Sequence, residues 1–294
     1  MRLVATVPLN TPPELRALAE DVLGAVARAR FVSIGSLMAY GGPDGLSLEV
    51  LDAWCRAGLV HRGRVQPDPL RPEEIEYVAL TTVGARALHA ATGRVVEGTT
   101  AARLKRSSQK RMHDVLVGEC ALAVLALAKE KRIDLVGVET DDRKLAHAVH
   151  IAVPGQEPER IVLQPDGLIV TKGPMGHEAL LVEVDRSTTA PKRMQLRYKG
   201  YLAWQKARGP VSDFGIGALR VLTLVPTKAR LETLHAAALE ANEGRRSGFL
   251  IFGLLDDVTV CAAERLLELV ARPLGGEPGQ RVRLISLAVP SAAA

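Results

Sequence analysis

The chain of 294 residues is long enough for two domains of ordinary size. Its hydrophobic content of 47% excludes general disorder, and because aromatic residues make up only 3%, the cores must be aliphatic. The formal net charge of +5 suits a nucleic-acid partner, but many proteins without one share it. The distribution of charge along the chain must therefore decide whether a nucleic-acid partner is expected.

Cysteine usage and hydropathy exclude two further classes. Cys55, Cys120 and Cys261 are few, odd in number and widely spaced, so neither a zinc site nor a disulfide framework is expected. The start of the chain has no long apolar segment behind a basic stretch. The longest apolar stretch, near 121–128, is too short and too closely flanked by charge to span a bilayer. We expect a cytoplasmic protein with no membrane segment.

Residues 11–92 have the pattern of three helices followed by two strands and a further helix. Apolar residues recur at helical spacing over 15–26, Ser33 can begin a second helix, and Ser47 can cap a third that Gly58 ends. The runs 59–64 and 76–81 are typical of short strands. This layout predicts a winged helix-turn-helix domain that binds DNA.

In such a domain the third helix enters the major groove and the strands form the wing. We therefore expect Ser47 and Arg56 to contact DNA from the helix, and Arg62 and Arg64 to contact phosphates from the wing. A small helical domain that contacts another protein is the alternative. The third helix is weak support for DNA binding, because its only arginine is accompanied by Glu49 and Asp52.

A basic linker is expected at 93–106, before a second domain at 107–290. Arg103, Lys105 and Arg106 can follow a phosphate backbone, although a solvated start to the next helix explains them equally well. That helix is expected to run from Ser107 or Ser108 to about residue 131. Further helices are expected over 191–206 and, near the end of the chain, over 258–272.

The most informative stretch is 164–204. Pro165-Asp166 leads into an apolar run, a Gly/Pro-rich turn follows, and a second apolar run carries Glu183 and Asp185, which predicts an antiparallel hairpin. Because side chains alternate along a strand, Glu183 and Asp185 share one face, and Asp166 can lie across from them. Three acids there are costly to desolvate without a hard cation or a basic side chain as partner.

This pattern resembles the PD-(D/E)XK nuclease fold, in which a Pro-Asp begins one strand and a Glu-x-Lys ends the next. The resemblance implies a restriction-endonuclease-like α/β domain in which Asp166 and Glu183 bind a metal, Mg²⁺ being the expected ion. It also suggests Glu119, on the preceding helix, as an additional acid, although a solvent-facing glutamate is the alternative. Asp185 occupies the position of the motif's lysine, which puts catalysis in doubt.

The longer run Glu-Val-Asp-Arg-Ser-Thr at 183–188, followed by a basic helix with Tyr201, resembles the replication-relaxation family. Members of that family occur on plasmids and conjugative elements, and they pair a winged helix-turn-helix with a nuclease-like domain. Arg197 and Tyr201 align with a basic residue and a tyrosine of the family pattern, and His113 with a histidine. Arg197 can neutralise the acids in place of the missing lysine, or it can be a surface arginine.

These observations favour a mixed α/β protein that binds double-stranded DNA. The family resemblance implies an accessory or regulatory protein of a plasmid or mobile element, acting in replication, relaxation or transcription control. Its nuclease-like domain is expected to be inactive and to need no cofactor, and a homodimer and relaxase or replication proteins are the implied partners. The alternatives are an interaction module and a magnesium-dependent DNA endonuclease. In the endonuclease, Asp166, Glu183 and Asp185 are catalytic, with Glu119 and Arg197 as auxiliaries.

Overall fold

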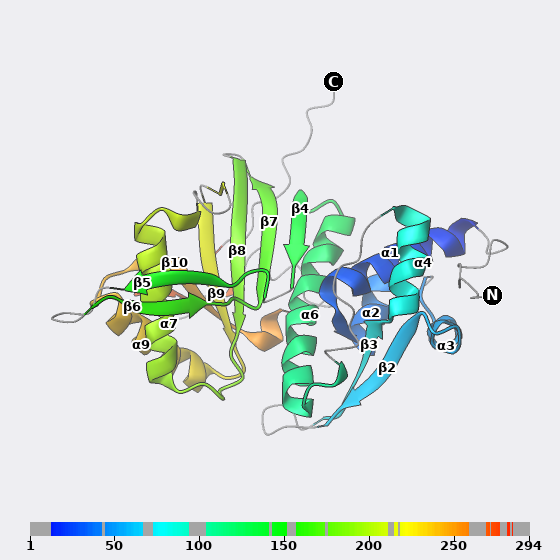
Figure 1. Cartoon of the computed structure of the whole chain (residues 1–294), viewed down its shortest axis with the longest axis horizontal. Helices are drawn as coiled ribbons and strands as arrows, with labels where there is room; N and C mark the ends of the chain where they lie inside the picture. The colour runs from blue at the N-terminus through cyan, green and yellow to red at the C-terminus, as the bar shows by residue number, and fades with distance from the viewer. Residues whose placement is uncertain are drawn as a thin grey trace. The chain divides into compact units, whose positions relative to one another are not determined.

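The computed structural model of this chain (Figure 1) describes residues 13–42, 45–66, 73–93, 104–140, 143–151, 157–173, 176–210, 215–216, 218–258, 269–270, 272–276, 281–282 and 284. Helices and sheets are both present, so the expected mixed α/β class is confirmed. By packing, the chain divides into one unit within residues 1–126 and a second that begins at residue 127. Arg103 lies outside the described residues.

Helices and a small antiparallel sheet form the amino-terminal unit. The sheet has the order β1-β3-β2, with Phe31 opposite Ala79 and Val60 opposite Leu80. Side-chain caps begin the helices, as Ser33 accepts from Ser36 N–H and Ser47 from Val50 N–H. The elements are α1 (Pro13–Ala29), β1 (Phe31–Ser33), α2 (Ile34–Gly41), α3 (Leu48–Arg56), β2 (Val60–Val65), β3 (Ile75–Leu80) and α4 (Thr82–Thr92).

Helix α6 (Ser108–Lys129) packs closely against the strand β1. A Cβ atom added at Gly118 would lie 1.6 Å from the carbonyl oxygen of Phe31, so only glycine permits this approach. We expected this helix to begin a second domain at residue 107. Most of it groups instead with the amino-terminal unit, up to Ala126, because it crosses β1 at this distance.

A six-stranded mixed sheet organises the carboxyl-terminal unit, in the order β12-β10-β9-β8-β7-β4. The strands β8, β9 and β10 are parallel to one another, whereas β7 pairs antiparallel with both β8 and β4. The predicted hairpin is therefore confirmed, with its strands paired from Gly167–Val182 to Gly173–Gly176. The strands are β4 (Leu135–Glu139), β7 (Gly167–Gly173), β8 (Gly176–Val184), β9 (Ala218–Val225), β10 (Ser247–Leu254) and β12 (Arg272–Leu274).

Two helices connect the parallel strands and share one core with them. Helix α7 (Pro191–Lys206) joins β8 to β9, and α9 (Lys228–Ala241) joins β9 to β10. Tyr198 and Tyr201 of α7, fully buried, and Leu234 of α9 lie in this core. The separate hairpin of β5 (His147–Ile151) and β6 (Glu159–Leu163) packs on α7 at Gly200, where an added Cβ would meet Leu163 at 2.9 Å.

Near the end of the chain the structure differs from our expectation. Within the predicted helix 258–272, the described residues Leu269–Val270 form the strand β11, which pairs with β13 (Arg281–Val282), and β12 begins at Arg272. A short 3-10 helix, η1 (Leu255–Asp257), precedes them. In the described part of the chain no helix is long and apolar enough to cross a membrane.

Candidate functional site

The hairpin register places Asp166 beside Glu183. Asp166 immediately precedes β7, and its N–H donates to the carbonyl of Val182 at 2.9 Å. The N–H of Val184 donates to Asp166 Oδ2 at 2.7 Å. Asp166 and Glu183 therefore lie on adjacent strands at the same end of the sheet, as the Pro-Asp and Glu positions of the sequence predicted.

Glu183 is buried, with 1% of its surface exposed, and both of its carboxylate oxygens are bound by helix α7. Arg197 donates to Oε2 at 2.5 Å, and the Tyr201 hydroxyl donates to Oε1. The negative charge of Glu183 raises the pKa of Arg197, while burial and then Glu183 raise the pKa of Tyr201 far above its usual value. The guanidinium is thus held charged and the phenol neutral, and both donate to Glu183.

Asp185 is also buried, at 5% exposure, and its partner comes from helix α9. Arg230 donates from Nε to Oδ2 at 2.7 Å and from NH2 to Oδ1 at 3.0 Å. This two-pronged geometry suits an arginine better than a lysine. Arg230 also donates to the carbonyl of Thr189, and the N–H of Ser187 donates to Asp185 Oδ2 at 2.9 Å.

The three acids therefore meet arginine, tyrosine and backbone donors. Among the described residues, no group of three or more His, Cys, Asp and Glu side chains has an arrangement that could hold a metal ion. A magnesium ion at Asp166 and Glu183 would have to displace Arg197 from a short ion pair. The ion pair that we considered for Arg197 is formed, and Asp185 has an arginine of its own.

Glu119 is bound within the amino-terminal unit. Its Oε1 accepts from the backbone N–H of Ser33 at 2.8 Å, and its Oε2 accepts from the Ser36 hydroxyl. Both partners lie at the first turn of α2, where the unpaired N–H groups and the helix dipole favour a carboxylate. These contacts give Glu119 a structural role at the start of α2, and its role as an auxiliary catalytic acid stays a prediction.

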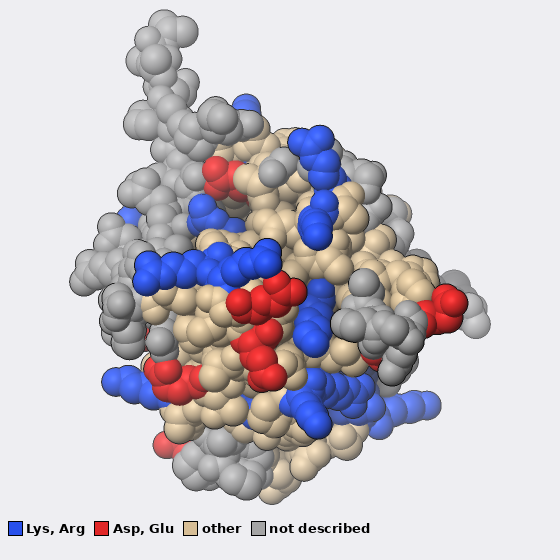
Figure 2. Space-filling view, turned by 90° about the vertical axis from the view of Figure 1, so that its left-hand side faces the viewer, with Lys and Arg blue, Asp and Glu red and all other residues tan. Residues whose placement is uncertain are grey.

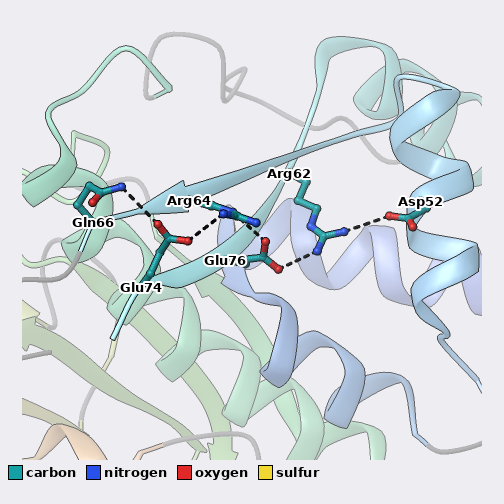
Figure 3. Close-up of polar contacts among 6 residues, drawn as sticks. All are labelled: Asp52, Arg62, Arg64, Gln66, Glu74 and Glu76. Atoms are coloured by element: carbon teal, nitrogen blue, oxygen red, sulfur yellow. Dashed lines mark hydrogen bonds and ion pairs between the residues drawn. The ribbon is translucent and has the colours of Figure 1, made fainter. Parts of the chain in front are cut away.

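Ion pairs occupy both arginines of the β2–β3 hairpin (Figure 3). Arg62 bridges Asp52 at 3.1 Å and Glu76 at 2.7 Å, and Arg64 contacts Glu74 at 3.2 Å and Glu76 at 3.0 Å. The hydrogen bond from Arg62 lowers the pKa of Glu76, which therefore stays ionised. A phosphate would have to replace these carboxylates, although exposed pairs of this kind are individually weak.

The face formed by α3 and this hairpin is acidic overall. Its described residues include five acidic and three basic side chains. Ser47 uses its side-chain oxygen to cap α3, accepting from Val50 N–H at 3.3 Å, while Arg56 is exposed. The acidic side chains are Glu49, Asp52, Glu73, Glu74 and Glu76, and the basic ones are Arg56, Arg62 and Arg64.

The expected basic linker is only partly available for phosphate contact. Lys105 is exposed, but Arg106 donates to both carboxylate oxygens of Asp114, at 3.0 and 3.2 Å, and Asp114 is buried. This pair lies within the amino-terminal unit, where it satisfies a carboxylate on α6. Arg106 therefore has a structural partner, which its place in a basic run did not indicate.

Arg230 and Asp114 are the important residues that sequence reasoning missed. The only signal for Arg230 was indirect, since a buried Asp185 requires a basic partner. Arg230 stands 45 positions away, at the start of a helix whose Thr227 cap was recognisable. In the sequence alone, nothing distinguishes Arg230 from the other arginines that follow β8.

Comparison with known proteins gives little further guidance. No family model matches the chain, and no curated protein matches it. Two solved structures are similar at 11% identity: restriction endonuclease FokI bound to DNA, with a TM-score of 0.27 over 89% of this chain and 69% of that one, and FokI, with a TM-score of 0.24 over 72% and 56%. Scores this low carry no argument, so the function must be argued from the site itself.

Proposed function

We propose that this protein binds double-stranded DNA without cleaving it. The proposal rests on the order of elements in the amino-terminal unit, which is α1-β1-α2-α3-β2-β3 with the sheet order β1-β3-β2. Three helices and an antiparallel hairpin in this order are the layout of a winged helix-turn-helix domain. We assign α3 as its recognition helix and the β2–β3 hairpin as its wing.

The absence of cleavage is inferred from the acids of the carboxyl-terminal unit. Phosphodiester hydrolysis by a metal needs carboxylates open to the ion and a positive group that stabilises the developing charge. Here Arg197 neutralises Glu183, and Arg230 neutralises Asp185. Both carboxylates are buried within the fold. We therefore propose that the acids at this end of the sheet have a nuclease-like arrangement but only a structural role.

The biological setting rests on the family resemblance of 183–201 alone. That resemblance suggests an accessory or regulatory role on a plasmid or mobile element, with relaxase or replication proteins as partners. A homodimer is part of the same proposal. The first requirement of this setting is DNA binding through the amino-terminal unit.

Removing the acids of the wing tests this requirement. Glu74→Gln with Glu76→Gln should free Arg64 from both of its carboxylate partners and leave Arg62 paired with Asp52 alone, so duplex affinity should increase and its salt dependence should steepen. One newly available cation corresponds to a change in the slope of log K against log salt of about 0.9. Fluorescence anisotropy with a labelled duplex, over a series of salt concentrations, measures both quantities.

A charge-matched variant controls for the general loss of negative charge. Glu130→Gln with Glu157→Gln removes two exposed acids of the carboxyl-terminal unit and should leave the slope unchanged. Conversely, Arg62→Glu with Arg64→Glu should weaken binding to every duplex. Equal gains from both glutamine variants would reject the wing as a phosphate contact.

A further inference from the structure

Two adjoining hollows lie at one end of the carboxyl-terminal sheet, where α7 and α9 end and β9 and β10 begin. Their volumes are about 380 and 560 Å³, and both are lined by Gln205. Gly244 follows the end of α9 with a φ of 75°, a conformation that favours glycine, and its N–H donates to the carbonyl of Leu239. The basic residues that line the two hollows are Lys206, Arg208, Arg220, Arg245 and Arg246.

This groove keeps a positive charge after its internal partners are counted. Glu243 is the one acidic side chain among the described residues that line it, and it pairs with Arg245 at 2.6 Å, while each helix end adds about half a negative charge. Among the described residues, Lys206, Arg208 and Arg246 form no ion pair, and all three are exposed. After the two helix ends are subtracted, roughly two positive charges remain on the described residues of the groove. The arginines of the β2–β3 hairpin differ, because neighbouring carboxylates neutralise their charge.

Figure 2 shows one face of the molecule, on which Lys and Arg side chains form several separate groups, with Asp and Glu side chains in several places among and beside them. The end of the sheet with the groove is opposite to the end with the acids, since Ala218 begins β9 whereas Asp185 pairs with Leu224 near its end. The positive groove and Asp166 are thus separated by the length of the parallel strands.

The side chains of the groove distinguish between kinds of anion. Proteins that bind single strands combine a basic groove with exposed aromatic rings on which bases stack. Here the one aromatic side chain among the described lining residues, Phe249, is only 4% exposed. Arginine guanidinium groups suit phosphate oxygens, and no described lining residue offers an exposed aromatic ring for base stacking. A phosphate backbone of a duplex fits this combination best.

We propose that this groove holds the phosphate backbone of double-stranded DNA, without sequence preference, as a second contact surface of the protein. The inference rests on the proposed DNA-binding function and adds its site in the carboxyl-terminal unit. Contact by Lys206, Arg208 and Arg246 supplies affinity, while sequence preference belongs to α3. The surface lies away from Asp166 and Glu183, so the duplex is held without approaching the acids.

The test compares two triple variants of the full chain that lose the same charge. Lys206→Ala/Arg208→Ala/Arg246→Ala removes the groove cations, and Lys192→Ala/Arg193→Ala/Lys228→Ala removes exposed cations at the opposite ends of α7 and α9. Binding to a labelled duplex is measured by anisotropy from low to moderate salt. Circular dichroism and unfolding midpoints check that both variants fold like the parent.

The groove variant should lose affinity by about tenfold or more at 0.1 M salt, and its salt slope should fall by about 2.7, whereas the control should change little. Equal losses of affinity in both variants would mean that overall charge determines duplex binding. A loss in the control alone would place the duplex at the end of the sheet with the acids. Either result overturns the inference. An unchanged groove variant overturns it too. If the unaltered protein binds no duplex at low salt, the proposed function itself fails.

Discussion

Replacing Arg230 with alanine should lower the free energy of unfolding by roughly 3–5 kcal/mol. The reason is that Asp185, which is 5% exposed, would lose the partner of both carboxylate oxygens and remain buried as an uncompensated charge. Arg230 is itself largely buried, with 11% of its side chain exposed, so water cannot readily take its place. Urea unfolding followed by circular dichroism measures the change.

Two comparisons make this result specific. Arg245→Ala removes an arginine from an ion pair of similar length with Glu243, but that pair is about three-quarters exposed, so the cost should stay under about 1 kcal/mol. The double variant Arg230→Met/Asp185→Leu removes both buried charges and should be clearly more stable than Arg230→Ala. Equal costs for Arg230→Ala and Arg245→Ala would contradict the role that we give to the buried pair.

Asp185→Lys is the substitution that would recreate the lysine of the nuclease motif, and we expect it to unfold the protein rather than to restore cleavage. It would place an ammonium group against Arg230, where the carboxylate now accepts two hydrogen bonds. Two buried cations at this separation repel strongly, and the cost should exceed roughly 3–5 kcal/mol. Soluble expression, circular dichroism and plasmid nicking measure the outcome.

The charge swap Asp185→Lys/Arg230→Glu is the matched control. The double variant again places one positive and one negative group at positions 185 and 230, so part of the lost stability should be recovered. Full recovery is not expected, because a lysine cannot form the two parallel hydrogen bonds of the arginine. A folded Asp185→Lys single variant with magnesium-dependent nicking would reverse our interpretation of the site. It would mean that Arg230 can move away from position 185 at little cost.

The central hairpin could be predicted from sequence because its signals are local. Apolar runs on both sides of a Gly/Pro-rich turn indicated β7 and β8, and the alternation of side chains placed Glu183 and Asp185 together. The helix over 191–206 was likewise predicted with its observed limits, from Pro191 to Lys206. These features depend on residues that are neighbours in the chain.

The partners of the acids could not be predicted, because they depend on contacts between distant segments. Glu119 resembled an auxiliary catalytic acid, yet its hydrogen-bond partners stand 83 and 86 positions away. Arg62 and Arg64 looked available for phosphate, but the strand pairing brings Glu74 and Glu76 beside them. Charge counted along a sequence therefore overestimated the positive charge that the hairpin presents.

DNA binding without cleavage can be measured in one assay, in which the unaltered protein binds or nicks a supercoiled plasmid with and without Mg²⁺. We expect retarded migration at low salt in both conditions, with the plasmid recovered supercoiled after the protein is removed. Magnesium-dependent nicking that Asp166→Ala abolishes would contradict this expectation and establish an endonuclease. A complete lack of retardation at low salt would contradict the DNA-binding function itself.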